Sequence, residues 1–394
     1  MASGSEFDML KYLSTLRLMP PTLITSTLEG SWAIQVLKSA VELGIFESLV
    51  DGPLSAALIA KKQALQVEGT KLIADSLVGM NLLDRADLNG KVRSTEAIYE
   101  LNMISQAYLI SESPLFMGMY LKQHDELDKM WRNLRETIRT GTPVMAVNED
   151  AKAEEIFPHL AEAIVPLNYC IAADVVKYLK ERNQVAESAK SMKGAQRSRP
   201  AKDGDNEEVD VVSGGKTTKN IKKALNILDL AAGSAVWSIP FAQDNCDNHI
   251  AALDFPAVLA VTRKITERFE VSSQYTEVPG NWRDIRLTPG LYDVVILGHI
   301  LHSEGLEMSK RLLAYCAAAL KEGGTLVIAE FMPNQERTAP LYPLMFGLNM
   351  YLATADGCVF SFDEITSLCR AAGFSDVYRH QGVEYDSPVV FATK

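Results

Sequence analysis

From Ala224 to the C-terminus, short apolar runs alternate with helical stretches, and this alternation constrains the fold more than any other feature. The apolar runs are "LNILDL", "HIAALDF", "SSQYTEVPGNW", "YDVVILGHIL" and "TLVIAEFMP". Such alternation predicts the α/β class, with a largely parallel, doubly wound sheet. The last 19 residues predict a terminal antiparallel strand pair. In such sheets, ligands bind at the carboxyl ends of the strands.

Two helices of this region have readable ends. The stretch "MSKRLLAYCAAALKEGG" predicts a helix that stops at Gly323-Gly324. The stretch "SFDEITSLCRAAGF" predicts a helix in which Ser361 is the N-cap and Glu364, three residues later, completes a capping box. Both helices fall between predicted strands, which supports the alternating order.

Residues 8–181 have a mainly helical pattern that is interrupted by the turn Asp51-Gly52-Pro53 and by a predicted strand pair around Asn89-Gly90. The order helix, turn, helix and strand pair is winged-helix-like. Two later stretches, 113–143 and 154–181, are rich in Met, Phe and Tyr. Core packing, a dimer interface and an apolar ligand pocket all remain open for these two stretches.

The remaining segments complete the predicted domain organisation. Residues 182–223 lack aromatic side chains and are dense in charge, Gly and Ser, so we expect a flexible linker or insertion. Residues 1–7 contain a Gly-Ser-Glu-Phe run of the kind that adjacent cloning sites encode, and we treat them as an expression scar. Residues 224–394 form the predicted α/β domain.

Charge and cysteine content exclude several classes of partner. The chain has 39 basic and 50 acidic residues and a net charge of -11, which argues against nucleic acid and against an anionic membrane. Its five cysteines include no CxxC pair, which argues against a disulfide framework and a zinc site. No apolar run reaches transmembrane length. We therefore expect a cytoplasmic protein.

The stretch "ILDLAAGSAVWSIPFA", residues 227–242, predicts a strand, a tight turn of small residues and a helix. Asp229 ends the strand, and small side chains at Ala231, Gly233 and Ala235 let a ligand approach the backbone closely. Alanine fits such a turn if φ stays negative at its positions. Strand–helix packing without a ligand is the alternative reading of this stretch.

An acidic residue follows the second predicted strand. Asp254, in "ALDFP", is placed where a carboxylate accepts hydrogen bonds from the ribose hydroxyls of a nucleotide or nucleoside. The alternative is a carboxylate that only caps a helix or a turn. The turn before it makes the ligand role the better interpretation.

In their order and spacing, five segments resemble the S-adenosylmethionine-dependent O-methyltransferases of the plant and bacterial small-molecule type. They are "ILDLAAGSAVWSIPFA", "ALDFPAVLAVTRK", "VPGNWRDI", "YDVVILGHILHSEGLEMSKRLL" and "ALKEGGTLVIAEFMP". The resemblance implies a Rossmann-like class I methyltransferase sheet after a winged-helix-like dimerisation domain. It also implies S-adenosylmethionine as cofactor, a homodimer, a small-molecule acceptor and a place in secondary metabolism.

The resemblance assigns cofactor roles to individual positions. The methionine part would lie on one strand end and its turn, the ribose on Asp254, and the adenine between Phe255 and the segment Gly280-Asn281-Trp282. Asn281 stands where the family usually has Asp, which keeps an acceptor but removes a charge. The implied cofactor-binding residues are Asp229, Ala231, Gly233, Asp254, Phe255, Gly280, Asn281 and Trp282.

His302, in "GHILHSEG", occupies the position of the family's catalytic histidine. An imidazole titrates near pH 6.5 when unperturbed, so it is suited to accept a proton from an attacking hydroxyl. The resemblance makes Glu330 the carboxylate that orients His302. The family's second supporting carboxylate would fall near Val359, where this chain has no acid. His299 has no obvious third ligand to form a metal site with His302, so we expect no metal and a structural or pocket role for His299.

The resemblance also implies which positions would contact the acceptor, and these lie on two segments. One segment follows the fifth predicted strand, and the other belongs to the helical domain. The implied pocket residues are Phe116, Met119, Tyr120, Met345, Phe346, Asn349 and Met350.

Taken together, the sequence predicts a methyltransferase that acts on a hydroxyl of an aromatic or polyketide-like small molecule, with His302 as general base. One alternative is a member of the family that binds S-adenosylmethionine without methylating, in the manner of a hydroxylase or pericyclase. Another is a non-catalytic dimer. A nicotinamide-dependent oxidoreductase would predict G-x-G-x-x-G in the first turn, which is absent.

Overall fold

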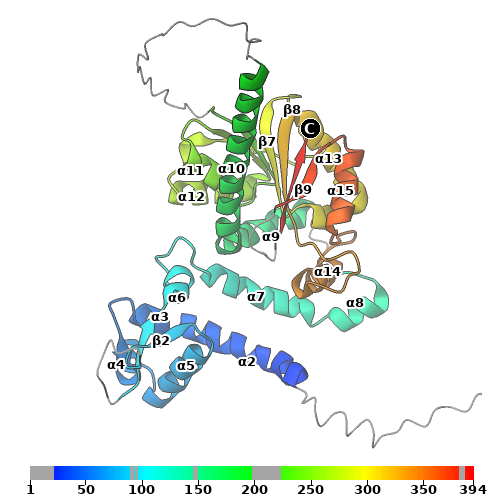
Figure 1. Ribbon diagram of the computed structural model, residues 1–394. Coiled ribbons are helices and arrows are strands. Elements are labelled where there is room, and N and C mark those ends of the chain that lie inside the picture. Colours follow the sequence, from blue (N-terminus) through cyan, green and yellow to red (C-terminus); the bar gives the residue numbers. More distant parts are fainter. Residues whose placement is uncertain (1–21, 89–93, 95, 145–149, 198–222, 381–386) are drawn as a thin grey trace, which may run out of the picture. The chain divides into compact units, whose positions relative to one another are not determined.

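A computed structural model describes residues 22–88, 94, 96–144, 150–197, 223–380 and 387–394 (Figure 1). The chain divides into two compact units, Met1–Gly118 and Met119–Lys394. Each unit has its own buried apolar cluster, and each is described separately below.

The N-terminal unit is mainly helical and carries a small antiparallel sheet of order β1-β3-β2. Apolar residues of the helices and of β3 form its core around Phe46, Leu77 and Tyr99. This combination confirms the predicted winged-helix-like fold; the predicted turn at Asn89-Gly90 lies outside the described residues. The elements are α2 (Thr22–Glu42), α3 (Ile45–Ser48), β1 (Leu54–Ser55), α4 (Ala56–Gln63), α5 (Val67–Gly79), β2 (Leu83–Arg85), β3 (Ile98–Leu101) and α6 (Met103–Tyr108).

The second unit contains a seven-stranded sheet of order β6-β5-β4-β7-β8-β10-β9. The first five strands in this order are parallel, and β10 runs antiparallel to both of its neighbours, as predicted for the terminal pair. The strands are β4 (Asn226–Leu230), β5 (His249–Asp254), β6 (Tyr275–Pro279), β7 (Tyr292–Gly298), β8 (Leu320–Ala329), β9 (Val377–Arg379) and β10 (Val389–Thr393). The α/β class with a class I methyltransferase sheet is therefore confirmed.

Helices cover both faces of this sheet (Figure 1). Successive residues of a strand point to opposite faces, so Leu228 packs with α13 and α15 while Ile227 packs with α10 and α11. The helices of this unit are α7 (Gly118–Trp131), α8 (Leu134–Thr140), α9 (Asp150–Ala163), α10 (Val165–Arg197), α11 (Ile239–Asp244), α12 (Pro256–Arg268), the 3-10 turn η1 (Ser272–Gln274), α13 (Leu301–Ala319), α14 (Leu341–Ala353) and α15 (Phe362–Ala371).

The compact units divide the chain at a different place from the predicted domains. Helices α9 and α10 pack against α12 and α11 of the α/β unit, so they belong with the sheet rather than with the N-terminal helices. Helix α10 also continues to Arg197, into the segment 182–223 that the sequence predicted as a linker. Polar composition alone does not end a helix, because lysine, glutamate, glutamine and alanine are all strong helix formers. The rest of that segment, residues 198–222, lies outside the described part.

The predicted ends of two helices had different outcomes. Ser361 is the N-cap of α15, and its capping box with Glu364 is confirmed. The stop of α13 at Gly323-Gly324 was wrong, because the helix ends at Ala319 and strand β8 begins at Leu320. Leu320 pairs with Tyr292 ahead of a register shift in the β7–β8 ladder, so sheet pairing ends the helix before the glycines do.

Among the described residues, no single helix is long and apolar enough to cross a membrane. The segments Ile156–Ala163 and Val165–Arg182 pass that test only as a pair, and they are bent by 61° where they meet. Apolar side chains of α10 pack in the core against one face of the sheet.

Candidate functional site

Parallel strands bring the predicted cofactor segments together at the carboxyl ends of the strands. Leu230 of β4 pairs with Leu253 of β5, and Asp254 pairs with Pro279 of β6. The turn after β4, the residues after β5 and the segment after β6 therefore follow three neighbouring strand ends. The carboxyl ends of the strands are where α/β proteins bind their ligands.

The turn after β4 has an unusual backbone. Ala231, Gly233 and Ala235 have φ values of 55°, 57° and 61°, which all lie in the left-handed region. The condition that the alanines keep negative φ is therefore not met. A non-glycine residue in this region costs roughly 1–2 kcal/mol, so two of the three positions carry strain. Such strain is typical of ligand-binding turns.

Asp254 holds this turn from the neighbouring strand. The Gly233 backbone N–H donates to Asp254 Oδ2 at 2.9 Å, and the Phe255 N–H donates to Oδ1 at 2.7 Å. Thr262 Oγ1 donates to the Gly233 carbonyl at 2.6 Å. Burial raises the pKa of Asp254 to about 6 against the opposing effect of these backbone donors. Its carboxylate therefore caps the turn, and each of its oxygens retains a second lone pair for a ligand.

Asp229, at the end of β4, is buried and belongs to a polar network. Ser238 Oγ donates to Asp229 Oδ2 at 2.5 Å and lies 3.0 Å from Tyr275 Oη. Burial raises the pKa of Asp229 to about 7, the Ser238 hydrogen bond opposes this shift, and the charge of Asp254 adds to it. Two carboxyl groups with raised pKa values therefore flank the turn. A cationic ligand would stabilise their ionised forms.

The segment after β6 is a compact turn. The Gly280 N–H donates to the Asp254 carbonyl at 2.9 Å, which ties this segment to the β5 end. Asn281 Oδ1 accepts the Arg283 backbone N–H at 3.0 Å. Trp282 is largely buried and packs against Tyr315, with the ring centroids 5.8 Å apart. The three residues lie together as the resemblance requires, and their contacts with adenine remain a prediction.

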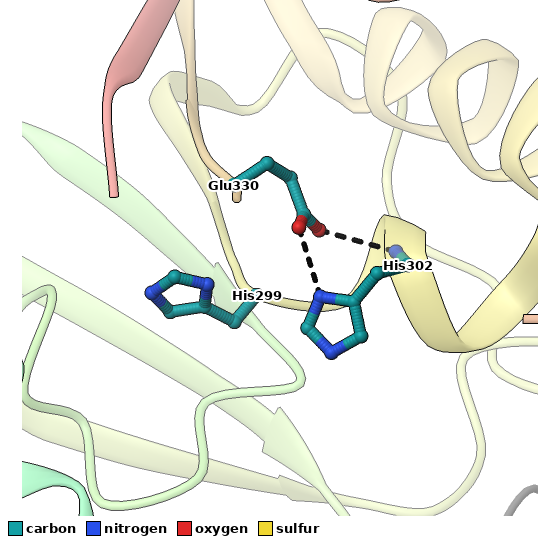
Figure 2. Close-up of side chains that lie close together, drawn as sticks. All are labelled: His299, His302 and Glu330. Carbon is teal, nitrogen blue, oxygen red and sulfur yellow. Dashed lines mark hydrogen bonds and ion pairs between the residues drawn. The ribbon is translucent and has the colours of Figure 1, made fainter. Parts of the chain in front are cut away.

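His302 and Glu330 form a buried pair at the ends of β7 and β8 (Figure 2). The His302 Nδ1 atom lies 2.8 Å from Glu330 Oε2, and the His302 backbone N–H donates to Glu330 Oε1 at 3.2 Å. Both residues are less than one-tenth exposed. The carboxylate thus fixes both the ring and the start of α13, which leaves the other ring nitrogen, Nε2, available for chemistry.

The charge state of Glu330 suits this arrangement. Burial opposes ionisation of the carboxyl group, but the attraction of His302 and its hydrogen bonds outweigh burial and keep the pKa of Glu330 below its usual value. An ionised Glu330 accepts the Nδ1–H of His302, and it would stabilise the imidazolium that forms when Nε2 takes a proton. A histidine that is paired in this way can act as a general base.

His299 lies beside this pair, with a left-handed φ of 64° (Figure 2). Its Nε2 atom lies 3.2 Å from Asn168 Oδ1 and 3.1 Å from Ser387 Oγ. Burial lowers the pKa of His299 to about 4, the charge of Glu330 opposes this shift, and His302 adds to it. Ligand atoms of His299, His302 and Glu330 lie within 4.8 Å of one another. Glu330 is thus the third metal-type ligand that the sequence analysis did not find.

Aromatic rings line the His302 side of the site. The Phe346 ring meets the His302 ring edge-on at 4.9 Å between centroids, and Phe331 stacks on His299 at 4.4 Å. Tyr342 meets Phe331 at 5.1 Å. Of the predicted pocket residues, Phe346 contacts the His302 ring directly. Phe331 was missed, although it follows Glu330 immediately in the sequence.

The other predicted pocket positions lie on α7, on α14 and in the N-terminal unit. Asn349 Oδ1 accepts the Trp131 indole N–H at 2.9 Å, which joins α14 to α7. Met350 is buried, Met345 is 46% exposed, and Met119 and Tyr120 are half-buried on α7. Phe116 belongs to the N-terminal unit. Their part in the acceptor pocket remains a prediction.

Val359 stands where the resemblance places a second supporting carboxylate, so an apolar side chain occupies that position. Val359 is buried, and its carbonyl accepts Arg337 Nη1 at 3.0 Å. One residue earlier, the Cys358 N–H donates to the His302 carbonyl at 2.8 Å. This loop therefore supports His302 through its backbone, and Glu330 is the carboxylate that contacts the ring among the described residues.

Two protein-family models match the chain. The O-methyltransferase dimerisation domain matches residues 25–111, and the O-methyltransferase domain matches residues 209–375. Together they cover more than half of the sequence. The first match falls in the N-terminal winged-helix-like unit, and the second includes the strand ends that carry Asp229, Asp254, His302 and Glu330.

Individual relatives match over nearly the whole chain. The 3-hydroxy-5-methyl-1-naphthoate 3-O-methyltransferase of Streptomyces sahachiroi is 23% identical over 93% of this chain and 92% of its own length. The acetylserotonin O-methyltransferase of Gallus gallus is 25% identical over 95% and 98%. The crystal structure of human N-acetylserotonin methyltransferase with SAM has a TM-score of 0.69 and 20% identity, covering 100% of this chain and 99% of that one.

Proposed function

Because the chain belongs to the family of S-adenosylmethionine-dependent O-methyltransferases, we propose that it methylates a hydroxyl group of a polycyclic aromatic or polyketide-like small molecule, with His302 as the general base. The observation that carries this proposal is the buried pair of His302 and Glu330 at two adjacent strand ends. The cofactor supplies an electrophilic methyl group on a sulfonium.

His302 acts at its Nε2 atom. Glu330 holds the Nδ1–H of the ring at 2.8 Å, so the Nε2 lone pair is free to accept the proton of the acceptor hydroxyl. As that proton moves, the hydroxyl oxygen gains the electron density that it needs to attack the methyl carbon. The ionised Glu330 then stabilises the imidazolium. The protein otherwise contributes position, because in-line displacement requires close alignment of the reacting atoms.

The cofactor would bind across the ends of β4, β5 and β6. Asp229, Ala231 and Gly233 would hold its methionine part, Asp254 the ribose, and Phe255 and Gly280–Trp282 the adenine. The strained turn offers its backbone to the ligand, and the raised pKa values of Asp229 and Asp254 indicate carboxyl groups that a cation would help to ionise. These assignments are proposals, and they rest on the position of all these residues at the carboxyl ends of neighbouring strands.

The acceptor class follows from the rings beside His302 and from two relatives. Phe331, Tyr342 and Phe346 present flat apolar surfaces, which suit a fused-ring acceptor. The named relatives act on a hydroxynaphthoate and on acetylserotonin, which are both bicyclic aromatic hydroxyl compounds. We therefore propose a bicyclic or larger aromatic acceptor.

An acceptor panel tests this proposal. The enzyme is incubated with S-adenosylmethionine and 3-hydroxy-2-naphthoate, N-acetylserotonin or phenol, and methyl ethers are measured by mass spectrometry. We expect turnover of at least one bicyclic compound, with kcat/KM at least about tenfold above that for phenol, because the larger ring buries more apolar area. Equal turnover of phenol would contradict the proposed class.

Cofactor affinity should depend on pH in a defined window. Asp254 and Asp229 have pKa values raised by burial to about 6 and about 7, so both must ionise to hold a cationic cofactor. We expect the Kd for S-adenosylmethionine to be level above about pH 8, to rise by about tenfold per pH unit below pH 7 as Asp229 protonates, and to rise more steeply below pH 6, where Asp254 also protonates. Titration calorimetry from pH 5 to 8.5 measures this. Asp254→Asn should weaken binding and flatten the profile; an unchanged profile would remove Asp254 from the site.

The dimerisation-domain match supports a homodimer, and we propose that α2 contributes to its interface. Ile24, Leu28 and Trp32 recur every four residues along α2, and all three are about two-thirds or more exposed in the single chain. Spacing of four residues places them on one helix face. An exposed apolar stripe of this kind is typical of an interface.

A charge in this stripe should separate the protomers. Trp32→Glu would bury an unpaired carboxylate, so we expect the variant to elute with the 43.4 kDa mass of one chain, and the wild type with twice that mass. Light scattering after size-exclusion chromatography measures both. Leu291→Glu, at an exposed apolar residue outside the matched dimerisation domain, is the control and should remain dimeric. A dimeric Trp32→Glu would exclude α2 from the interface.

A further inference from the structure

The side chain of His299 has a fixed tautomer. Asn168 Nδ2 donates to the Ile164 carbonyl at 3.2 Å, which orients the amide so that Oδ1 faces the histidine. Oδ1 lies 3.2 Å from His299 Nε2 and can only accept, so Nε2 must carry the proton. It follows that the other ring nitrogen, Nδ1, presents a bare lone pair.

That lone pair is buried and unsatisfied. Among the residues that the structure describes, Nδ1 of His299 has no hydrogen-bond partner and exposes less than 1 Å². The ring nitrogen next to the Cβ-bearing carbon faces the His302–Glu330 pair in Figure 2. A buried acceptor without a partner destabilises the fold, and the left-handed φ of 64° at the same residue adds strain. Both costs point to a function for this orientation.

Size and chemistry distinguish the possible partners of Nδ1. A water-sized sphere does not reach the atom, so neither water nor an acceptor hydroxyl reaches it in this conformation. A dehydrated divalent cation is smaller. Two imidazole nitrogens and one carboxylate oxygen form a set that favours zinc and similar divalent transition metals over magnesium or calcium.

We propose that His299 Nδ1, His302 Nδ1 and Glu330 bind one divalent transition-metal ion of the Zn²⁺ class. One ligand-type atom from each of the three residues lies within 4.8 Å of the other two, and His302 Nδ1 and Glu330 Oε2 are already 2.8 Å apart. Metal–ligand bonds of about 2.0–2.2 Å place tetrahedral ligands ~3.4 Å apart, so side-chain shifts on the order of 1 Å close the site. Asn168 and Ser387 support His299 through its other nitrogen, as partners of metal-bound histidines do.

Metal binding at this position has a definite consequence for the proposed base. The ion takes the place of the proton on His302 Nδ1, and that single proton moves to Nε2 of the same ring. A neutral imidazole with metal on Nδ1 carries its remaining proton on Nε2. Nε2 therefore has no lone pair for an acceptor hydroxyl, and methyl transfer stops. This consequence rests on the proposed role of His302, whereas metal binding itself does not.

Titration of the full-length, chelator-treated protein with ZnCl₂ tests the site. We expect one Zn²⁺ per chain and a Kd that rises at least about 30-fold in His299→Phe, which retains a ring against Phe331 but removes the ligand. Asn168→Ala should weaken binding by about tenfold by removing the group that fixes the tautomer. His249→Phe, an exposed histidine outside the cluster, should bind as the wild type does.

A second readout separates this proposal from the proposed function. Saturating Zn²⁺ should abolish methyl transfer by the wild type and not by His299→Phe, and a chelator should restore it. If the enzyme proved not to methylate the probes, the stoichiometry and the variant Kd values would still decide the metal site. Absence of Zn²⁺ binding, or equal affinity in the wild type, in His299→Phe and in Asn168→Ala, would overturn the proposal.

Discussion

Replacing His302 with glutamine is expected to lower kcat for methyl transfer by about 10²–10⁴-fold, the usual contribution of a positioned general base. Glutamine retains a polar side chain of similar reach, but it has no basic nitrogen to take the acceptor proton. The proposed cofactor segments lie at the ends of β4, β5 and β6, whereas His302 follows β7, so the Kd for S-adenosylmethionine should stay within about threefold of the wild type.

Rapid-quench assays and titration calorimetry measure the two quantities separately. The matched variant is Glu330→Gln, which keeps the shape of the side chain but removes the charge that stabilises the imidazolium. It should lower kcat by a smaller factor than His302→Gln. A wild-type kcat for His302→Gln would show that the base lies elsewhere, whereas a parallel loss of cofactor binding would indicate that the fold of the site had changed.

Gly233→Val is expected to weaken S-adenosylmethionine binding by at least about 100-fold. Gly233 has a φ of 57°, which a β-branched residue adopts only with severe strain. Its N–H donates to Asp254 and its carbonyl accepts Thr262, so a shift of this backbone disturbs both neighbours of the turn. A loss of about 2.7 kcal/mol in binding free energy corresponds to this factor.

Gly233→Ala is the control for bulk without branching. A Cβ at this position would meet Ala161 Cβ at 3.6 Å, an ordinary contact, so alanine should cost only its backbone strain, about 1–2 kcal/mol. Binding is measured by calorimetry and folding by thermal unfolding. A folded Gly233→Val that binds the cofactor as the wild type does would mean that the turn only packs against its neighbours.

The sheet, and the grouping of the candidate site residues at its strand ends, could be predicted from the sequence because both depend on local patterns. Alternating apolar and helical segments determine the parallel strands, and parallel strands place their carboxyl ends together, so Asp229 and Asp254 were expected near one another. The pairing of His302 with Glu330 follows from the adjacency of β7 and β8.

Other features depend on contacts or conformations that leave no local signal. The left-handed φ of Ala231 and Ala235 could not be predicted, because alanine disfavours that region and only the surrounding turn imposes it. The partners of His299 are equally hidden: Asn168 is 131 residues away and Ser387 is 88 residues away. Strand pairing at Leu320 likewise ended α13 before the glycines that were expected to stop it.

The central claim is that this site transfers a methyl group to a hydroxyl oxygen and passes the displaced proton to His302. The most direct test uses cofactor with a ¹³C-labelled methyl group and a bicyclic aromatic hydroxyl acceptor, with NMR of the product and quantitation of S-adenosylhomocysteine. Our account predicts one labelled methoxy group per S-adenosylhomocysteine formed, and loss of both signals together in His302→Gln. Cofactor binding without any labelled methoxy product from the acceptor panel would contradict it.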